Sequence, residues 1–125
     1  MTLRHLVLLR FKPESDAGER AAVESAFAAL AAQIAEVQTL EWGLDCSPEG
    51  LSHGFTHGYA LGFADAKARD VYLLHPAHQA FSTLARPHLA DVLVLDYHAI
   101  ETVPPPRKGT GVLRSSHPPT TGDES

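Results

Sequence analysis

The chain has 125 residues, of which 44% are hydrophobic, and its formal charge is −5 at pH 7 with histidine neutral. This length indicates a single domain with one hydrophobic core, and the acidic balance argues against a protein that binds nucleic acid. Cys46 is the only cysteine, so the chain has neither an internal disulfide nor a paired-cysteine metal site, which fits a reducing compartment.

Residues 3–11 have the alternating pattern of a strand. One face carries Leu3, His5, Val7, Leu9 and Phe11, and the other carries Arg4, Leu6, Leu8 and Arg10. This beginning does not have the pattern of a signal peptide, and no apolar run approaches the length that spans a membrane. We therefore expect a soluble cytoplasmic protein with no membrane partner.

A helix is predicted after this strand. Ser15 or Asp16 caps its start, Glu19 lies in its first turn, and the pattern continues to about Glu36. Its apolar stripe consists of Val23, Phe27, Leu30, Ile34 and Val37.

Two strands are predicted next, over residues 39–46 and 55–63, on either side of a loop rich in proline and glycine. The second strand alternates most cleanly, because large side chains share one face and small ones the other. The large side chains are Phe55, His57, Tyr59, Leu61 and Phe63.

Two helices and a strand complete the predicted fold. Asp65 caps a short helix, Pro76 opens a second helix, and Pro87 ends or kinks it. Residues 92–98 form the last strand. The order β-α-β-β-α-β indicates an α+β fold of ferredoxin-like type.

Two strand segments are apolar at every position, namely residues 6–9 and 92–95. Such strands favour burial on both faces, but the chain has too few helices to cover both faces of its sheet. We therefore predict a homodimer in which two sheets face each other, which is a dimeric α+β barrel.

The folded domain is predicted to span residues 1–101. Residues 102–125 are rich in proline, glycine, serine and threonine, and they contain too little apolar surface to offset the entropy of ordering. We predict that this segment is a disordered tail.

His5 and His57 lie on predicted strands among large apolar neighbours. Each is either a core histidine satisfied by a hydrogen bond or a polar group that lines an apolar pocket. Metal binding is disfavoured. His53 and His57 have the spacing of helical ligands but lie in a predicted loop and strand, and no clustered carboxylate or cysteine motif supports His75 with His78. We expect no metal.

The segment YLLHPAHQAF, residues 72–81, combines a tyrosine, a proline and two histidines at helical spacing. Pro76 suits the first position of a helix, so His78 falls in the first turn. The positive end of the helix dipole disfavours an imidazolium, so His78 stays neutral near pH 7 and available as a base. Tyr72, one turn before His75, offers a hydroxyl that can bind a carbonyl or enolate oxygen. The alternative roles are amphipathic packing for Tyr72 and capping for His78.

These residues resemble a known family. RHLVLLRFK at the start, Trp42-Gly43, Thr56-His57 and YLLHPAHQAF are similar to the stress-responsive A/B barrel family, called Dabb, over residues 3–99. The resemblance implies a dimeric α+β barrel without a cofactor. Many members have no established activity, but one branch is a plant polyketide cyclase that closes a linear poly-β-ketoacyl thioester by an intramolecular aldol condensation.

The resemblance also implies site residues. In it, His78 is the catalytic base, Tyr72 holds the thioester oxygen, and His5 and His57 orient the chain or the base. The expected cavity between sheet and helices is lined by Val7, Leu9, Val23, Phe27, Tyr59 and Leu89. Phe27 and Leu89 replace a tyrosine and a tryptophan of the plant enzyme, which changes the pocket shape and points to a different substrate.

Two functions follow. The first is a polyketide cyclase or related proton-transfer enzyme that acts on a small apolar β-keto compound. The alternative is a non-catalytic stress-response dimer that binds small hydrophobic molecules. Cofactor-free oxygenation, as in other dimeric α+β barrels, rests on fold analogy alone.

Overall fold

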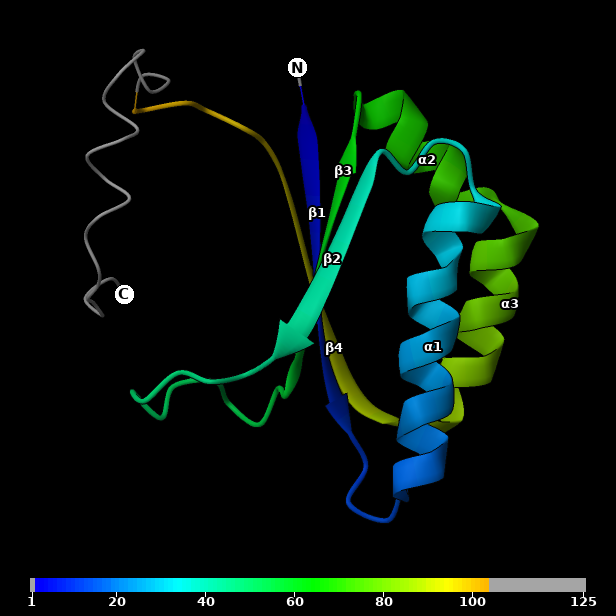
Figure 1. The fold of residues 1–125 in the computed structure, drawn as a ribbon, viewed down its shortest axis with the longest axis vertical. Coiled ribbons are helices and arrows are strands. Elements are labelled where there is room, and N and C mark those ends of the chain that lie inside the picture. Colours follow the sequence, from blue (N-terminus) through cyan, green and yellow to red (C-terminus); the bar gives the residue numbers. More distant parts are fainter. Residues whose placement is uncertain (1, 104–125) are drawn as a thin grey trace, which may run out of the picture.

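The computed structural model describes residues 2–103, which form one antiparallel sheet with helices on one of its faces (Figure 1). The elements are β1 Leu3–Phe11, α1 Ala17–Gln33, β2 Thr39–Leu44, β3 His57–Phe63, α2 Ala66–Leu74, α3 Pro76–Ala85, the 3-10 turn η1 Arg86–His88 and β4 Leu89–His98. The strand order is β2-β3-β1-β4. This is the predicted α+β fold of ferredoxin-like type.

The boundaries of several elements differ from those predicted. The β2–β3 ladder is shorter than expected because the chain turns away after the bond from the Asp45 amide to the Thr56 carbonyl, and His53, Gly50 and Gly54 have positive φ in the loop. Strand β4 begins earlier than expected, because the 3-10 turn η1 leads directly to Leu89, which pairs with Phe11.

Local capping explains where the helices begin. Asp16 and Glu19 form a capping box at α1, with the Glu19 amide donating to Asp16 Oδ1 at 2.7 Å. Asp65 caps α2 with a single bond, accepting from the Ala68 amide at 2.9 Å. His75 is the N-cap of α3, and its Nδ1 accepts from the Ala77 amide at 3.0 Å.

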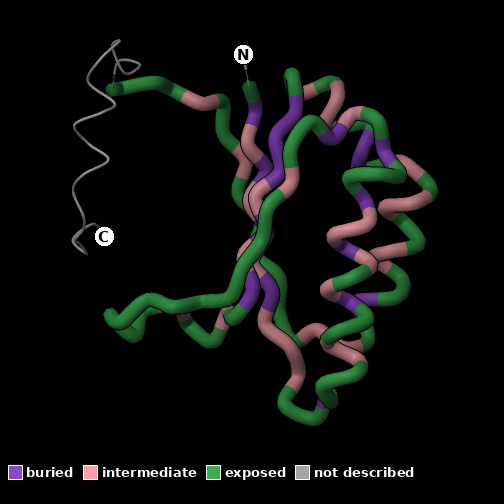
Figure 2. Tube along the Cα trace, in the orientation of Figure 1, coloured by how far each residue is buried: buried purple, intermediate pink, exposed green. Residues whose placement is uncertain are grey.

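The hydrophobic core lies between the sheet and the helices, where buried residues concentrate (Figure 2). Its largest fully buried side chains are Tyr59, Tyr72, Phe27, Phe63, Leu3, Leu9, Leu30, Ile34, Leu61 and Val23. Burial of each such apolar side chain contributes roughly 1.5–3 kcal/mol, so this layer holds the helices against the sheet.

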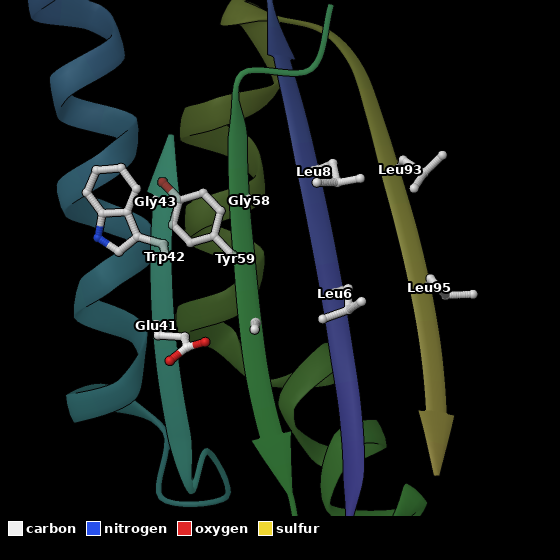
Figure 3. Close-up of a pocket in the computed structure, with 10 residues that line it drawn as sticks. Leu6, Leu8, Glu41, Trp42, Gly43, Gly58, Tyr59, Leu93 and Leu95 are labelled. Carbon is white, nitrogen blue, oxygen red and sulfur yellow. The ribbon is translucent and has the colours of Figure 1, made fainter. Parts of the chain in front are cut away.

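The other face of the sheet carries no helix (Figure 1). On this open face Leu6 pairs with Leu95 and Leu8 pairs with Leu93, which places four leucines side by side on β1 and β4 (Figure 3). Together with residues of β2 and β3, among them Glu41, Trp42 and Tyr59, they line a shallow groove of about 490 Å³. We refer to Leu6, Leu8, Leu93 and Leu95 as the leucine patch.

The predicted tail, residues 102–125, lies outside the described residues except for its first two positions. Within residues 2–103, no helix combines the length and the apolar character needed to cross a bilayer.

Candidate active site

A cavity of about 340 Å³ lies between the helices and the inner face of β1 and β4. Its walls come from every helix and from both strands. The apolar part of the wall includes Val7, Leu9, Phe27, Phe81, Leu89 and Val94, and the polar groups are His5, Tyr72, His78, Ser82, Arg86 and Asp96. A largely apolar cavity with a few convergent polar groups is the usual form of a small-molecule site.

Tyr72 and His78 lie against each other in this cavity, with ring centroids 4.7 Å apart. Tyr72 is 1% exposed, and its burial raises the pKa of the phenol well above its usual value. The hydroxyl therefore stays protonated near neutral pH and can donate a hydrogen bond to a ligand oxygen.

His78 occupies the third position of α3, two residues after Pro76, as the sequence predicts. Burial lowers the pKa of His78; the Leu73 backbone opposes this shift, and the charge of His5 adds to it. Its Nδ1 is buried without a hydrogen-bond partner among the described residues. A neutral imidazole with an unsatisfied nitrogen can accept a proton or bind a polar ligand atom.

His5 forms the other polar part of the cavity. It is 4% exposed, its Nδ1 donates to Asp96 Oδ1 at 2.6 Å, and its ring lies edge-on to Tyr72 with centroids 5.8 Å apart. The second carboxylate oxygen of Asp96 accepts from Arg69 Nη1 at 2.6 Å. Burial by itself would raise the pKa of Asp96, but the hydrogen bonds from Arg69 and His5 lower it below its usual value.

The structure brings most of the predicted site residues to this cavity. They are His5, Val7, Leu9, Phe27, Tyr72, His78 and Leu89. It does not bring Val23 and Tyr59 there. Val23 is fully buried in the core, and the Tyr59 ring stacks on Phe27 with centroids 3.8 Å apart, so it forms a layer beneath the Phe27 side chain.

His57 does not reach the cavity either. It pairs with Leu9, whereas His5 pairs with Leu61, so the two histidines are separated by four residues of strand, about 13 Å. His57 Nε2 donates to Glu24 Oε2 at 2.8 Å, and its Nδ1 accepts from the Thr56 hydroxyl at 2.7 Å. Both ring nitrogens are satisfied, so this histidine connects β3 to α1 as a core residue.

Asp96, Arg69 and Arg86 were not predicted as site residues from the sequence. Asp96 had a detectable signal, because it is the one charged residue in the predicted strand 92–98 and it alternates with Val92 and Val94. Arg69 and Arg86 had none, since each is one more charged residue on a solvated helical surface until the fold places it.

No group of three or more histidine, cysteine or acidic side chains within residues 2–103 is arranged to hold a metal ion.

Comparisons with known proteins identify the family of the chain. The profile of the family described as Stress responsive A/B Barrel Domain, Dabb, matches residues 3–99. Olivetolic acid cyclase of Cannabis sativa is 27% identical over 78% of this chain and 96% of its own length. The stress-response A/B barrel domain-containing protein HS1 of Arabidopsis thaliana is 33% identical over 76% of this chain and 87% of its own length.

Solved structures show the same architecture. Hydroxynitrile lyase from Passiflora edulis is 26% identical with a TM-score of 0.76, covering 82% of this chain and 97% of that chain. A dimeric ferredoxin-like protein of unknown function from Thermobifida fusca is 25% identical with a TM-score of 0.67, covering 79% of this chain and 92% of that chain. The similar proteins thus include a cyclase, a lyase and proteins without a known reaction.

Proposed function

Because the chain belongs to the stress responsive A/B barrel (Dabb) family, we propose that its cavity is the active site of a cofactor-independent polyketide cyclase. The reaction is an intramolecular aldol cyclisation of a small apolar β-polyketo acid or thioester. The observation that carries the proposal is the buried pair of Tyr72 and His78, in which His78 Nδ1 has no hydrogen-bond partner among the described residues.

In this reaction His78 acts as the base. It removes a proton from the carbon between two carbonyl groups, whose acidity makes a neutral imidazole a competent acceptor. Tyr72 donates a hydrogen bond to the thioester oxygen as negative charge develops on it. The carbanion then attacks a ketone carbonyl further along the same chain, so a carbon–carbon bond forms and the carbonyl π bond becomes an alkoxide.

The cavity walls support an apolar substrate. Phe27, Phe81 and Leu89 present hydrocarbon surface, and a volume of about 340 Å³ suits a short polyketide chain. Arg86 also lines the cavity and has no ion pair among the described residues, so it offers a positive charge to a carboxylate or thioester end. Similarity to a cyclase and a lyase is consistent with this reaction class.

We further propose that the chain is a homodimer joined through the leucine patch. The patch is apolar and no helix covers it, and the similar Thermobifida fusca protein is dimeric. In gel filtration we expect Leu93→Glu to give a monomer, and Leu84→Glu to remain a dimer. The two leucines are 45% and 44% exposed, but Leu84 lies on α3. A wild-type monomer at micromolar concentration would contradict the proposal.

We also propose a cytoplasmic location for the protein and limits for its catalytic domain. Cys46 is exposed and unpaired among the described residues, which suits a reducing cytoplasm. We propose that the catalytic domain spans residues 1–101.

The alternative function is a non-catalytic dimer that binds small hydrophobic molecules. HS1, a stress-response protein by name, is 33% identical to this chain, against 27% for the cyclase, which favours this alternative on overall similarity.

The test is hydrogen exchange in D₂O. Short β-ketoacyl thioesters and β-diketones of increasing tail length are incubated with the protein, and mass spectrometry follows replacement of their α-protons. We expect exchange above the buffer rate, increasing with tail length until the cavity is filled. Exchange equal to buffer across the panel, with a folded protein, would contradict the enzyme and favour the ligand-binding alternative.

A further inference from the structure

An aldol cyclisation needs two proton transfers at different places. The base removes a proton from carbon, and an acid must give a proton to the new alkoxide oxygen. Tyr72 is committed to the thioester oxygen, and its raised pKa makes it a weak acid. The cavity therefore needs a second group that carries a transferable proton.

His5 is placed to supply that proton. It lines the cavity, it is 4% exposed, and its ring is held between Tyr72 and Phe63, with centroid distances of 5.8 and 6.1 Å. Its Nδ1 is bound to the carboxylate of Asp96, and carboxylates only accept hydrogen bonds, so Nδ1 carries a hydrogen. The nitrogen that remains for a ligand is Nε2.

Asp96 is held in turn by Arg69. The guanidinium contacts Asp96 Oδ2 at 2.6 Å and Asp70 Oδ1 at 2.8 Å, so each carboxylate oxygen of Asp96 has its own donor. Asp96 stays ionised because these donors lower its pKa despite burial. An ionised carboxylate beside Nδ1 accommodates a second proton on the imidazole as an ion pair.

The two cavity histidines thus have opposite surroundings. His78 is desolvated at a helix N-terminus and has no carboxylate partner within residues 2–103, which favours its neutral form. His5, in contrast, is bound to the Asp96 carboxylate at 2.6 Å.

We propose that Arg69, Asp96 and His5 form a relay in which His5 is the acid of the cavity. The inference rests on the proposed cyclase function and adds a proton donor to it. His78 takes the α-proton. The electron pair left on that carbon forms the new carbon–carbon bond, and the π electrons of the attacked carbonyl move onto its oxygen. That oxygen takes the proton from Nε2 of the protonated His5. His5 thereby becomes neutral, and His78 has become protonated.

The protons and electrons of this scheme balance without another reactant. The cyclisation consumes no net proton, and after product release solvent carries a proton from His78 back to His5. His5 and His78 touch the reacting atoms in this scheme, whereas Asp96 and Arg69 are positioning residues. The charged or titratable groups that face His5 are Asp96 from β4, Tyr72 from α2 and His78 from α3, with Arg69 of α2 behind Asp96.

The test separates the two proton transfers. α-Proton exchange in D₂O needs the base alone, whereas ring closure of a β-polyketo thioester also needs the acid. For Asp96→Asn and His5→Gln we expect ring closure to fall about 100-fold. In the same variant, the fold-decrease in the α-proton exchange rate should be at least ten times smaller than the fold-decrease in the ring-closure rate. Asp91→Asn is the matched control, because Asp91 lies on the same strand and pairs with Arg10 at 3.3 Å in an exposed position.

Arg69 provides a graded variant. Arg69→Met removes the positive charge that holds Asp96, so the ring-closure rate should fall about tenfold. Arg69→Lys keeps a positive charge there, so the ring-closure rate should recover. Nitrogen-15 NMR of the histidine rings should show a hydrogen on Nδ1 of His5 in the wild type and in Arg69→Lys. In Asp96→Asn this signature should be lost.

Four outcomes would contradict the relay. A parallel fall of exchange and ring closure in Asp96→Asn would make His5 a structural residue or the base, with the proposed function intact. An unchanged ring-closure rate in Asp96→Asn would remove the relay altogether. Wild-type exchange without any ring closure would contradict the proposed cyclase function, and the relay with it, while leaving His78 as a working base. Absence of exchange in the wild type would contradict the proposed function itself.

Discussion

Two regions of the same sheet face hold a buried histidine, and they differ in what the histidine can do. His5 and His57 are 4% and 5% exposed, and both are bound to a carboxylate. At His57 the second nitrogen is also satisfied, by Thr56, whereas His5 lines a cavity that His78 shares. Burial and a carboxylate partner are thus common to both histidines. The position at the cavity wall distinguishes His5.

The largest effect is expected from loss of His78, the proposed proton acceptor of the cavity. His78→Ala should lower ring closure about 1,000-fold, because a positioned base contributes on the order of 10²–10⁴ in rate. The melting temperature and the oligomeric state should remain those of the wild type. A steady-state assay of cyclised product checks the rate. Unfolding of the variant would instead give His78 the structural role that His57 has.

Tyr72→Phe should lower ring closure about 100-fold, since loss of one donor to a developing oxyanion costs on the order of 10²–10³. The substitution keeps the ring that packs against His5 and His78, so stability should change little. Comparison of kcat with thermal unfolding checks both parts. A variant as active as the wild type would show that the hydroxyl binds no reacting oxygen.

The His57 region should respond in stability and not in rate. His57→Ala leaves Glu24 without its partner inside the protein, which costs roughly 2 kcal/mol in the free energy of unfolding. Urea unfolding measures this cost. The α-proton exchange rate per folded molecule should stay within about twofold of the wild type. A large loss of rate at full folding would return His57 to the active site.

The smallest expected effect is a shift of the pH dependence of the α-proton exchange rate to lower pH. The pKa of His78 lies below the ordinary 6.5, because burial disfavours its charged form. Since the neutral form is the base, the exchange rate should stay constant as pH falls through 6.5 and decrease only at lower pH. A rate measured from pH 4.5 to 8 on a fixed substrate checks this sign. A decrease centred above 6.5 would indicate a different base.

Much of this comparison was predictable from the sequence. Strand alternation, the capping residues and Pro76 gave the fold and placed His78 in the first turn of α3, because these are local effects. The separation of His5 from His57 was not predictable, since it depends on the register of β1 against β3. Arg69 of α2 and Asp96 of β4 come together only in the folded chain, and no local pattern encodes that contact.

The most direct test of the central claim is α-proton exchange of one β-ketoacyl thioester, measured in parallel for the wild type, His78→Ala and His57→Ala. If the cavity holds a working base, exchange falls to the buffer rate in His78→Ala and persists in His57→Ala. Equal exchange in the wild type and His78→Ala, or its loss in a folded His57→Ala, would contradict the assignment of the active site to this cavity.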